Sequence, residues 1–516
     1  MSLFLIPSKL SELASSQLQQ ETMVMQRRRY VPLGFSVDEE EDAVACILAC
    51  RGFLVLAFLL VDNRSASALP IPAGKVYAIP AFARKYGMPC SACHEAWPKL
   101  NNFGQSFKDN GYQMGNDRDA PIFQQPAYWP VSFRMTPQWH RVSADRADIC
   151  NPATGCGPAT GSPPTEGRLT THGFDLSGMD ILTAGTLAKN ISFLLVPAAE
   201  SDAVFGFESA NVRFSNLLKS GWMNIKVGKF ELDNMISEKR IMTLSDFGGY
   251  QIYHYQPVTE FTNPATLVPF TFGMGDNQIG AELSGHSKND YTRYSAALLS
   301  SNDGSVGVPN GHGYDTYLTF SQAFEAGSLG LQRVGAFAYV GRAPTYLATS
   351  SLLADGFGQK SFYRAGFFGL WYLKKLDFMT MYTRGADNVF LGTGTPSFSP
   401  LPAGAQGPIW NAGFIETHLT VNPQFILVNR YELIRMSRQA LPVTPGVFEP
   451  GVSVPSSNFG DIQALVFGYR YYPFMSSRAG FAIHNEFSTV RQRGVAPLSG
   501  KDLTNNSLFI GFDFIF

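Results

Sequence analysis

Residues from about position 129 onward alternate between apolar and polar side chains with a period of two. At the C-terminus, one face of residues 507–516 is apolar throughout, with Leu508, Ile510, Phe512, Phe514 and Phe516. The other face includes Ser507 and Asp513. Segments 424–433, 463–471 and 478–487 repeat this pattern, with aromatic or aliphatic residues opposite Arg, Glu or His. A period of two predicts β-strands whose two faces meet different environments.

The alternation recurs often enough for about 16 to 18 strands between residues 129 and 516. Besides the four segments above, the clearest are 180–188, 205–214, 222–230, 278–285, 291–300, 313–322, 331–341, 361–373, 376–384 and 411–419. Stretches rich in Gly, Pro and Ser at 144–168, 342–358, 385–410 and 437–459 are expected to be loops. Cys150 and Cys156 lie in the first loop and are expected to form a small disulfide, with two free thiols as the alternative.

An outward aromatic face and an inward face with Arg, Glu and His are typical of a membrane barrel with a polar lumen. A soluble sandwich would bury the apolar face instead, and alternation alone does not separate the two. Composition favours the barrel, because only 16% of the 516 residues are charged and 13% are aromatic. A mean hydropathy of −0.04 argues against a bundle of membrane helices. The fold class we expect is an all-β transmembrane barrel of about 16 antiparallel strands with a small N-terminal α-helical segment.

Two broad classes are excluded by composition. A hydrophobic fraction of 45% is far too high for a disordered chain. A formal net charge of −1 argues against a nucleic-acid binder that works through a basic surface.

The N-terminus is expected to be a leader. Arg51 precedes the apolar run Gly52–Val61, and Ala66-Ser67-Ala68 follows it, which is the order of a secretory signal peptide. An uncleaved N-terminal anchor is the alternative. Residues 1–45 do not fit a signal peptide, and a start codon assigned too early would explain them. We therefore expect a leader over 1–68, a minimal cytochrome segment over 69–128 and a barrel over 129–516.

The segment Cys90-Ser91-Ala92-Cys93-His94 carries the pattern of c-type haem attachment. Two thiols about one helical turn apart can reach two vinyl groups on one porphyrin edge, and the next residue then offers an imidazole to the iron. A zinc site is disfavoured because no second C-x-x-C or H-x-x-x-H follows, and a thioredoxin-like site because its βαβ context is missing. We expect one haem c, bound covalently by Cys90 and Cys93, with His94 as the proximal iron ligand.

The distal ligand is left open between Met114 and His140, with Met135 as a further candidate. The spacing of Trp97, Leu100, Phe103 and Phe107 predicts an amphipathic helix over 95–110 that ends at Asn110-Gly111. The remaining histidines show no metal-ligand spacing, and His484 beside Glu486 is the one that merits attention. Glu486 and Asp513 either attract iron or belong to a polar network in the barrel wall.

These features resemble the fused monohaem cytochrome c–porins, an outer-membrane family of Fe(II)-oxidising cytochromes in iron-oxidising bacteria. The motifs that carry the resemblance are residues 79–86, Cys90–His94, Trp97–Asn101, Phe103-Gly104 and Asn110–Tyr112. The resemblance implies a protein of a Gram-negative outer membrane, in contact with its lipid, that acts as an iron:cytochrome-type oxidoreductase. It implies that electrons pass from extracellular Fe(II) through one haem to a periplasmic carrier, a cytochrome c or a copper protein.

Three other functions remain as alternatives. One is a conduit for another extracellular donor, such as a mineral, an electrode or a sulfur compound. A second is a diffusion porin whose haem is structural. The third is a soluble periplasmic cytochrome with a β-sandwich.

Overall fold

The computed structural model describes residues 82, 86, 88–96, 99–112, 131–149, 165–199, 205–234, 251–252, 255, 261–262, 269–270, 272–300, 314–343, 360–389, 403–440, 461–475, 480–494 and 501–515. The N-terminal elements are η1 (Cys90–Ala92), β1 (His94–Ala96), β2 (Lys99–Leu100) and α4 (Asn102–Asp109). The first long strands are β3 (Val131–Ile149), β4 (Thr165–Ala188), β5 (Ile191–Ala199), β6 (Phe205–Phe214) and β7 (Asn224–Phe230). Between β7 and the next long strand lie the short β8 (Phe261–Thr262) and β9 (Pro269–Phe270), and two 3₁₀ turns lie elsewhere at η3 (Leu217–Lys219) and η4 (Gly327–Leu329).

Eleven further long strands complete the described elements. They are β10 (Gln278–His286), β11 (Thr292–Leu299), β12 (Asp315–Glu325), β13 (Leu331–Ala343), β14 (Lys360–Leu373), β15 (Leu376–Ala386), β16 (Ile409–Asn422), β17 (Phe425–Arg438), β18 (Ile462–Met475), β19 (Gly480–Gln492) and β20 (Leu503–Ile515).

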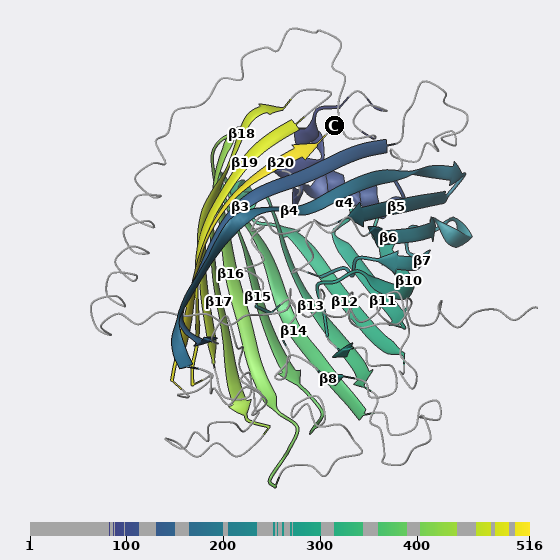
Figure 1. The fold of residues 1–516 in the computed structure, drawn as a ribbon. Helices are drawn as coiled ribbons and strands as arrows, with labels where there is room; N and C mark the ends of the chain where they lie inside the picture. The colour runs from purple at the N-terminus through teal and green to yellow at the C-terminus, as the bar shows by residue number, and fades with distance from the viewer. Residues whose placement is uncertain are drawn as a thin grey trace, which may run out of the picture.

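Sixteen of the described strands form one closed antiparallel barrel, as Figure 1 shows. Each long strand pairs with its neighbour along the chain, and β7 pairs with β10 across the intervening segment. The ring closes where β20 pairs with β3, for example at Ser507 opposite Val142. Closure satisfies the backbone of every strand in the ring, which a bilayer requires of any sheet that crosses it. The predicted all-β barrel is confirmed.

The two faces of the strands are those that the alternation predicted. On β20, Ser507, Phe509 and Asp513 are buried, whereas Leu508 is 40% exposed. On β19, His484 and Glu486 are 1% exposed and Phe487 is 48% exposed. Exposed aromatic residues therefore cover the outside, and charged residues line the lumen, which is the arrangement of a membrane barrel and the reverse of a sandwich.

Several boundaries differ from the prediction. The strands β3 and β5 were not among the clearest segments, because Pro137 and Pro197 interrupt them at irregular registers. The expected loop at 144–168 is partly strand, since β3 runs to Ile149 and β4 starts at Thr165. Similarly, β15 and β16 extend into the expected loop at 385–410. Polar residues on long strands beyond the bilayer explain why their ends resemble loops in the sequence.

The two ends of the barrel differ in the length of their connections. At one end, residues 374–375 and 423–424 join β14 to β15 and β16 to β17. At the other end, 344–359, 387–408 and 439–461 separate the strands. Outer-membrane barrels have short periplasmic turns and longer extracellular loops. We therefore assign the short-turn end to the periplasm and the long-loop end to the outside.

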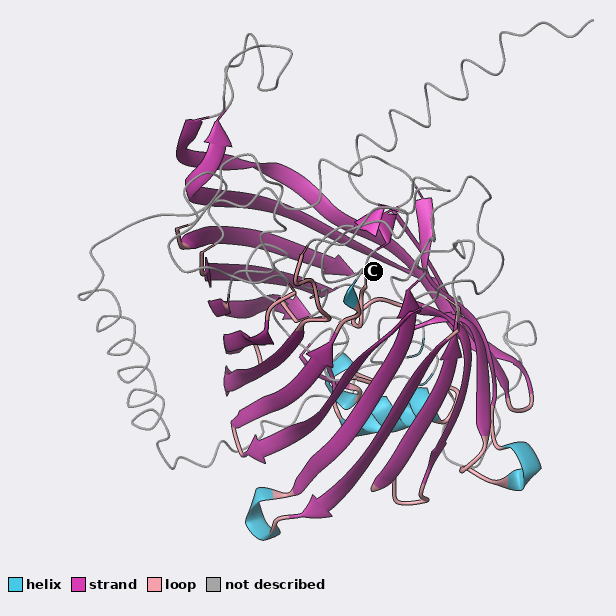
Figure 2. Cartoon of the chain, turned by 90° about the horizontal axis from the view of Figure 1, so that it is seen from below, coloured by secondary structure: helices cyan, strands magenta, loops and turns pink. Residues whose placement is uncertain are grey.

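We call η1, β1, β2 and α4 together the N-terminal segment. It lies inside the ring of strands, towards the short-turn end (Figures 1 and 2). The predicted helix is shorter than expected, because α4 begins at Asn102 and residues before it form the β1–β2 pair. Asn101 explains the later start. Its backbone is extended, and its side chain accepts a hydrogen bond from the backbone N–H of Gly104, as an N-cap does. The predicted C-terminus is confirmed, since Asn110 is the C-cap and Gly111 follows with φ of 69°.

The orientation of the strands makes a stability prediction. Phe367, near the middle of β14, is 67% exposed on the outer face. Replacing it in the F367R variant should cost about 2–4 kcal/mol of folding free energy in lipid vesicles, because a cation at the bilayer midplane is poorly solvated. Leu373 lies on the same face at the strand end, so L373R should cost about 0–1 kcal/mol. Urea titrations of both variants measure the difference, and equal losses would contradict this membrane placement.

Candidate functional site

The Cys-X-X-Cys-His sequence forms a tight turn followed by a short hairpin. Cys90–Ala92 make one 3₁₀ turn, and Cys93 leads into β1. In the β1–β2 pair His94 lies opposite Leu100, and Ala96 opposite Lys99. The hairpin therefore joins the residue expected to bind iron to a basic residue five positions later.

Asn101 and Gly104 hold this turn against α4. The Asn101 amide donates hydrogen bonds to the carbonyl oxygens of Ser91 and Ala92, at 3.2 and 3.0 Å. The Asn101 backbone N–H donates to the Cys93 carbonyl at 2.9 Å. A Cβ at Gly104 would overlap the same Cys93 carbonyl, so α4 approaches the turn as closely as glycine allows. The turn is thus fixed by its own neighbours in the sequence.

A small aromatic cluster supports α4 from another side. Phe107 is buried and packs edge-on against Phe82 and Tyr86, with ring centroids 5.0 and 5.6 Å away. Tyr112 stacks on Phe82 at 5.0 Å. These contacts tie Phe82 and Tyr86, which precede the Cys-X-X-Cys-His turn, to the helix that follows it.

The structure places the predicted site residues as follows. Cys93 and His94 are half-buried, and the backbone of Cys90 lies in η1. His140 lies on β3 opposite Phe509, whose side chain is buried in the barrel, so His140 belongs to the lumen face. Met135 lies opposite Phe514 on the outer face, which removes it as a lumen candidate. Met114, Cys150 and Cys156 lie outside the described residues, so the distal ligand and the disulfide stay predictions.

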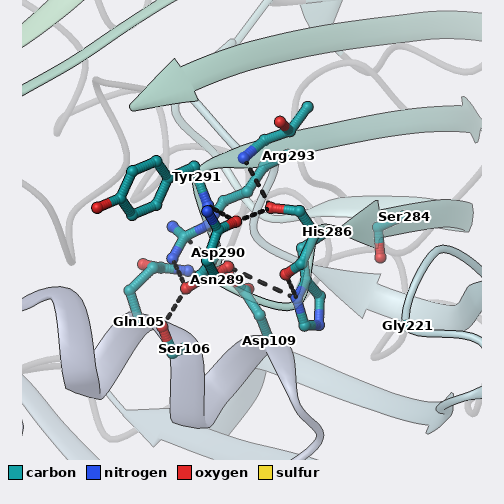
Figure 3. Close-up of polar contacts among 12 residues, drawn as sticks. Gln105, Ser106, Asp109, Gly221, Ser284, His286, Asn289, Asp290, Tyr291 and Arg293 are labelled. Carbon is teal, nitrogen blue, oxygen red and sulfur yellow. Dashed lines mark hydrogen bonds and ion pairs between the residues drawn. The ribbon is translucent and has the colours of Figure 1, made fainter. Parts of the chain in front are cut away.

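The C-terminal end of α4 is anchored to the β10–β11 turn and to β11 (Figure 3). The Arg293 guanidinium donates through Nε to Asp290 at 2.9 Å and lies 3.5 Å from an Asp109 carboxylate oxygen. The Ser106 hydroxyl donates to the same Asp290. Arg293 is 8% exposed, so this ion pair is screened little by solvent. It fastens the helix to the wall.

A small cavity of about 50 Å³ lies between α4 and this wall. Most of the residues that line it are polar or charged, and they include Lys108, Glu231, Arg213 and Glu282. Lys108 forms an ion pair with Glu231, and Arg213 donates to the backbone carbonyl of Asp109. One ion pair and one hydrogen bond to the backbone therefore hold the C-terminal half of α4 beside this cavity.

A second anchor holds the hairpin on β15 and β16. Lys99 is 3% exposed and forms an ion pair with Asp377. The Lys99 ammonium also lies 3.0 Å from Nδ1 of His418. Lys99 is paired with Ala96 in the hairpin, so this ion pair also holds β1, the strand that begins at His94.

The anchor continues along the lumen wall as a chain of buried charges. Nε2 of His418 lies 2.7 Å from Glu416, and Arg430 donates to Glu416 at 2.9 Å. Arg430 also donates to Glu432 at 3.1 Å, and Glu432 accepts from the backbone N–H of Ile252. We call the set Lys99, Asp377, His418, Glu416, Arg430 and Glu432 the lumen charge chain. It links the N-terminal segment to the segment that follows β7.

A separate polar network lines the neighbouring strands β18, β19, β20 and β3. Arg470 donates through Nε to Nδ1 of His484 at 3.0 Å, and Nε2 of His484 contacts Glu486. Arg134 donates to Asp513 at 3.1 Å, and Arg470 lies 3.6 Å from Asp513. Glu486 and Asp513 are thus members of a wall network, the second of the two roles the sequence allowed.

Towards the long-loop end, residues after β7 fold into the lumen and form an apolar cluster with the wall. Tyr255 packs edge-on against Trp410 at 4.7 Å, and Phe272 against Phe362 at 5.2 Å. Burial raises the pKa of the Tyr255 phenol, so its hydroxyl stays protonated and donates to Sδ of Met436 at 3.1 Å. The described lumen is therefore occupied from both ends.

Within the described part of the chain, no group of three or more His, Cys, Asp and Glu side chains could hold a metal ion. No helix there is long and apolar enough to cross a bilayer.

The sequence prediction missed the anchors of the N-terminal segment. Lys99 and Asp109 resemble ordinary surface charges of an amphipathic helix, and their partners are more than 180 residues away in the chain. One signal was present. Glu416 and His418 share the inward face of the predicted strand 411–419, as Arg430 and Glu432 do on the next strand.

A closed barrel with a charged lumen and an aromatic exterior is the arrangement of transmembrane β-barrels. The protein is a porin-like outer-membrane β-barrel. No family model matches the chain, and no curated protein matches it.

Several solved outer-membrane proteins are similar in architecture. A loop-deletion mutant of OmpT from Vibrio cholerae has a TM-score of 0.41 at 10% identity, over 75% of this chain and 99% of that chain. The channel DcaP of Acinetobacter baumannii also has a TM-score of 0.41 at 10% identity, over 75% and 97%. OccK2 of Pseudomonas aeruginosa has a TM-score of 0.40 at 10% identity, over 75% and 98%. Nothing about a substrate follows from similarities at this level.

The Arg293 anchor makes a prediction about the docked helix. The R293M variant leaves Asp109 and Asp290 without this buried cation, a loss of about 3–5 kcal/mol for such pairs. Amide hydrogen exchange over residues 102–112 should therefore become at least about tenfold faster. The control is R435M, because Arg435 is 38% exposed and pairs with Asp461 at the long-loop end. Unchanged exchange in R293M would show that the helix is held elsewhere.

Proposed function

We propose that this protein is an outer-membrane monohaem cytochrome–porin that accepts electrons from extracellular Fe(II) and passes them to a periplasmic electron carrier. It would act as an iron:cytochrome-type oxidoreductase, with a cytochrome c or a copper protein as acceptor. The observation that supports the proposal is a Cys-X-X-Cys-His turn fastened inside a closed barrel by buried ion pairs. A diffusion pore has no need of this arrangement.

The residues at the turn fit a covalently attached haem. Cys90 begins a single 3₁₀ turn, Cys93 directly follows it, and the adjacent His94 begins β1. Cys93 and His94 are half-buried, so each is supported on one side and accessible on the other. Cys90 and Cys93 would form the thioethers, and His94 would be the proximal ligand. His140 on the lumen face and Met114 remain the candidates for the distal side.

When bound, the haem supplies a one-electron centre whose potential depends on its ligands and its burial. The chain's own residues would orient the haem and shield it from water. Asn101 and Gly104 fix the turn, and Lys99 and Arg293 fix the segment against two parts of the wall. The barrel wall also keeps bulk water from part of the segment, which lowers the cost of reorganising solvent when a charge moves.

The position of the segment supports one direction for the proposed transfer. Its anchors Asp290 and Asp377 lie at or beside short turns, the end assigned to the periplasm. A carrier in the periplasm can approach this mouth. In this proposal, Fe(II) arriving from the long-loop side is oxidised to Fe(III), and the one electron it loses is accepted by the haem that the segment would hold.

The diffusion porin is the less well supported alternative. The N-terminal segment occupies the lumen at one end, and the cluster around Tyr255 and Phe272 occupies it at the other. A wide water-filled channel would need both to be absent. Planar-bilayer recordings should therefore show low conductance, and a large steady conductance would favour the porin.

Stopped-flow visible spectroscopy tests the main proposal. Oxidised, detergent-purified protein is mixed with Fe(II), and a ferrocytochrome c α-band should appear rapidly. The C90A/C93A variant should give no covalent haem and no band. A haem that dithionite reduces and Fe(II) does not would indicate another donor, such as a mineral, an electrode or a sulfur compound, or a structural haem. A protein without a c-type spectrum would contradict the assignment of the turn.

Gly104 gives a second prediction. In G104A the added methyl group would meet the Cys93 carbonyl, so the turn must shift. The covalent haem content per barrel should fall severalfold, measured as the pyridine haemochrome. Gln105 is the matched control, because among the described residues its side chain donates to Asp109 within the helix, and Q105A should keep nearly full haem content. Equal haem content in both variants would show that the approach of α4 does not shape the turn.

A further inference from the structure

The lumen charge chain contains one group that can hold or release a proton without losing its hydrogen bonds. His418 is 1% exposed, and its two ring nitrogens have different neighbours. Nδ1 lies 3.0 Å from the Lys99 ammonium and 2.9 Å from an Asp377 carboxylate oxygen. Nε2 lies 2.7 Å from Glu416.

Both protonation states of His418 are satisfied by these neighbours. In the neutral ring, Nδ1 accepts from Lys99 and the Nε2–H donates to Glu416. In the charged ring, the Nδ1–H donates to Asp377 and Lys99 keeps its ion pair with the same carboxylate. A buried histidine with one donor and one acceptor beside the same nitrogen is poised between the two states.

A second buried histidine lacks this choice. His484 also contacts a glutamate two residues away through Nε2. Its Nδ1 accepts from Nε of Arg470 at 3.0 Å, and a guanidinium is always a donor. A proton on that nitrogen would face the guanidinium, so the geometry favours the neutral ring. His484 is therefore a natural control for His418.

The charges around His418 favour uptake of a proton. The groups that face it in the described residues are Lys99 from β2, Asp377 from β15 and Glu416 from its own strand, followed by Arg430 and Glu432 from β17. Two of these are basic and three are acidic, so a charged His418 brings the buried set to neutrality. Buried sets of charges are most stable when they are balanced.

Lys99 connects this balance to the Cys-X-X-Cys-His turn. It lies in β2, next to Leu100, which is paired with His94. A charge added near His94 therefore acts on His418 by way of Lys99, and both Lys99 and His418 are buried, where electrostatic interactions are stronger than in water.

We propose that His418 is a proton-binding site coupled to the redox state of the docked segment, an inference that rests on the proposed function. One electron enters from the donor, and one proton enters from water and forms an N–H bond at Nδ1 of His418. The new charge on His418 offsets the added electron. Lys99 and Asp377 stay ionised, so no other proton moves. On oxidation, the electron leaves to the acceptor and the proton returns to water.

Spectroelectrochemical titration of the haem across about pH 5 to 8 tests this coupling on the full protein, because imidazoles titrate in that range. The midpoint potential of the wild-type protein should fall as the pH rises, since loss of the proton disfavours the reduced state. Full coupling is a tenfold change per pH unit, or about 59 mV for one electron. In H418Q most of this slope should be lost. In H484Q it should be retained.

The variant D377N provides an independent check if H418Q fails to assemble. It removes the carboxylate that accepts the Nδ1–H, so the sloping region should move to lower pH. A slope that survives in H418Q, or an unchanged sloping region in D377N, would overturn the proposal. So would a flat wild-type profile. The potential is set with an electrode, so these outcomes are separate from reactivity with Fe(II), and a protein without a c-type spectrum would overturn both proposals together.

Discussion

Closure of the sheet is the constraint on which the other features depend. A bilayer offers no partners for backbone N–H and C=O groups, so a sheet that crosses it must pair every strand on both sides. The pairing of β20 with β3 completes that ring. Once the ring is closed, successive residues of each strand point alternately to lipid and to the lumen, and every charged residue must be inside or beyond the membrane. The lumen therefore collects arginines, glutamates and histidines at close quarters, and each needs a partner there.

The charged residues of the lumen find their partners either within the barrel wall or in the N-terminal segment. In the network around Arg470, His484 and Asp513, wall residues pair with one another. On β15 to β17 the wall is completed by a residue from outside it, because Lys99 belongs to the N-terminal segment. The need to pair every buried charge thus produces a network within the wall around Arg470 and a docking site for Lys99 on β15 to β17. Arg293 and Asp109 repeat the second solution at the far end of α4.

The sequence predicted the local features well and the long-range contacts poorly. Strand faces such as that of Leu508 and Phe512 follow from a period of two, and the Asn110-Gly111 helix end follows from backbone preferences, so each is encoded within a few residues. The start of α4 was placed too early because an apolar spacing continues upstream of Asn101, and the cap decided the boundary. Asp377 and His418 were not recognised as site residues, since their role depends on a lysine about 300 positions away that only the closed ring brings to them.

The two anchors of the N-terminal segment lie on separate arcs of the ring. One is at β10 and β11, the other at β15 and β16, and β12, β13 and β14 lie between them. The N-terminal segment therefore spans the lumen between these two parts of the wall, and its own length fixes the distance that it can span. An extra hairpin within that arc would move the two anchors apart, and either Lys99 would lose Asp377 or Asp109 would lose Arg293. The N-terminal segment thus fits only a barrel in which these two parts of the wall lie a fixed distance apart. The number of strands between the anchors and the presence of the segment therefore depend on each other.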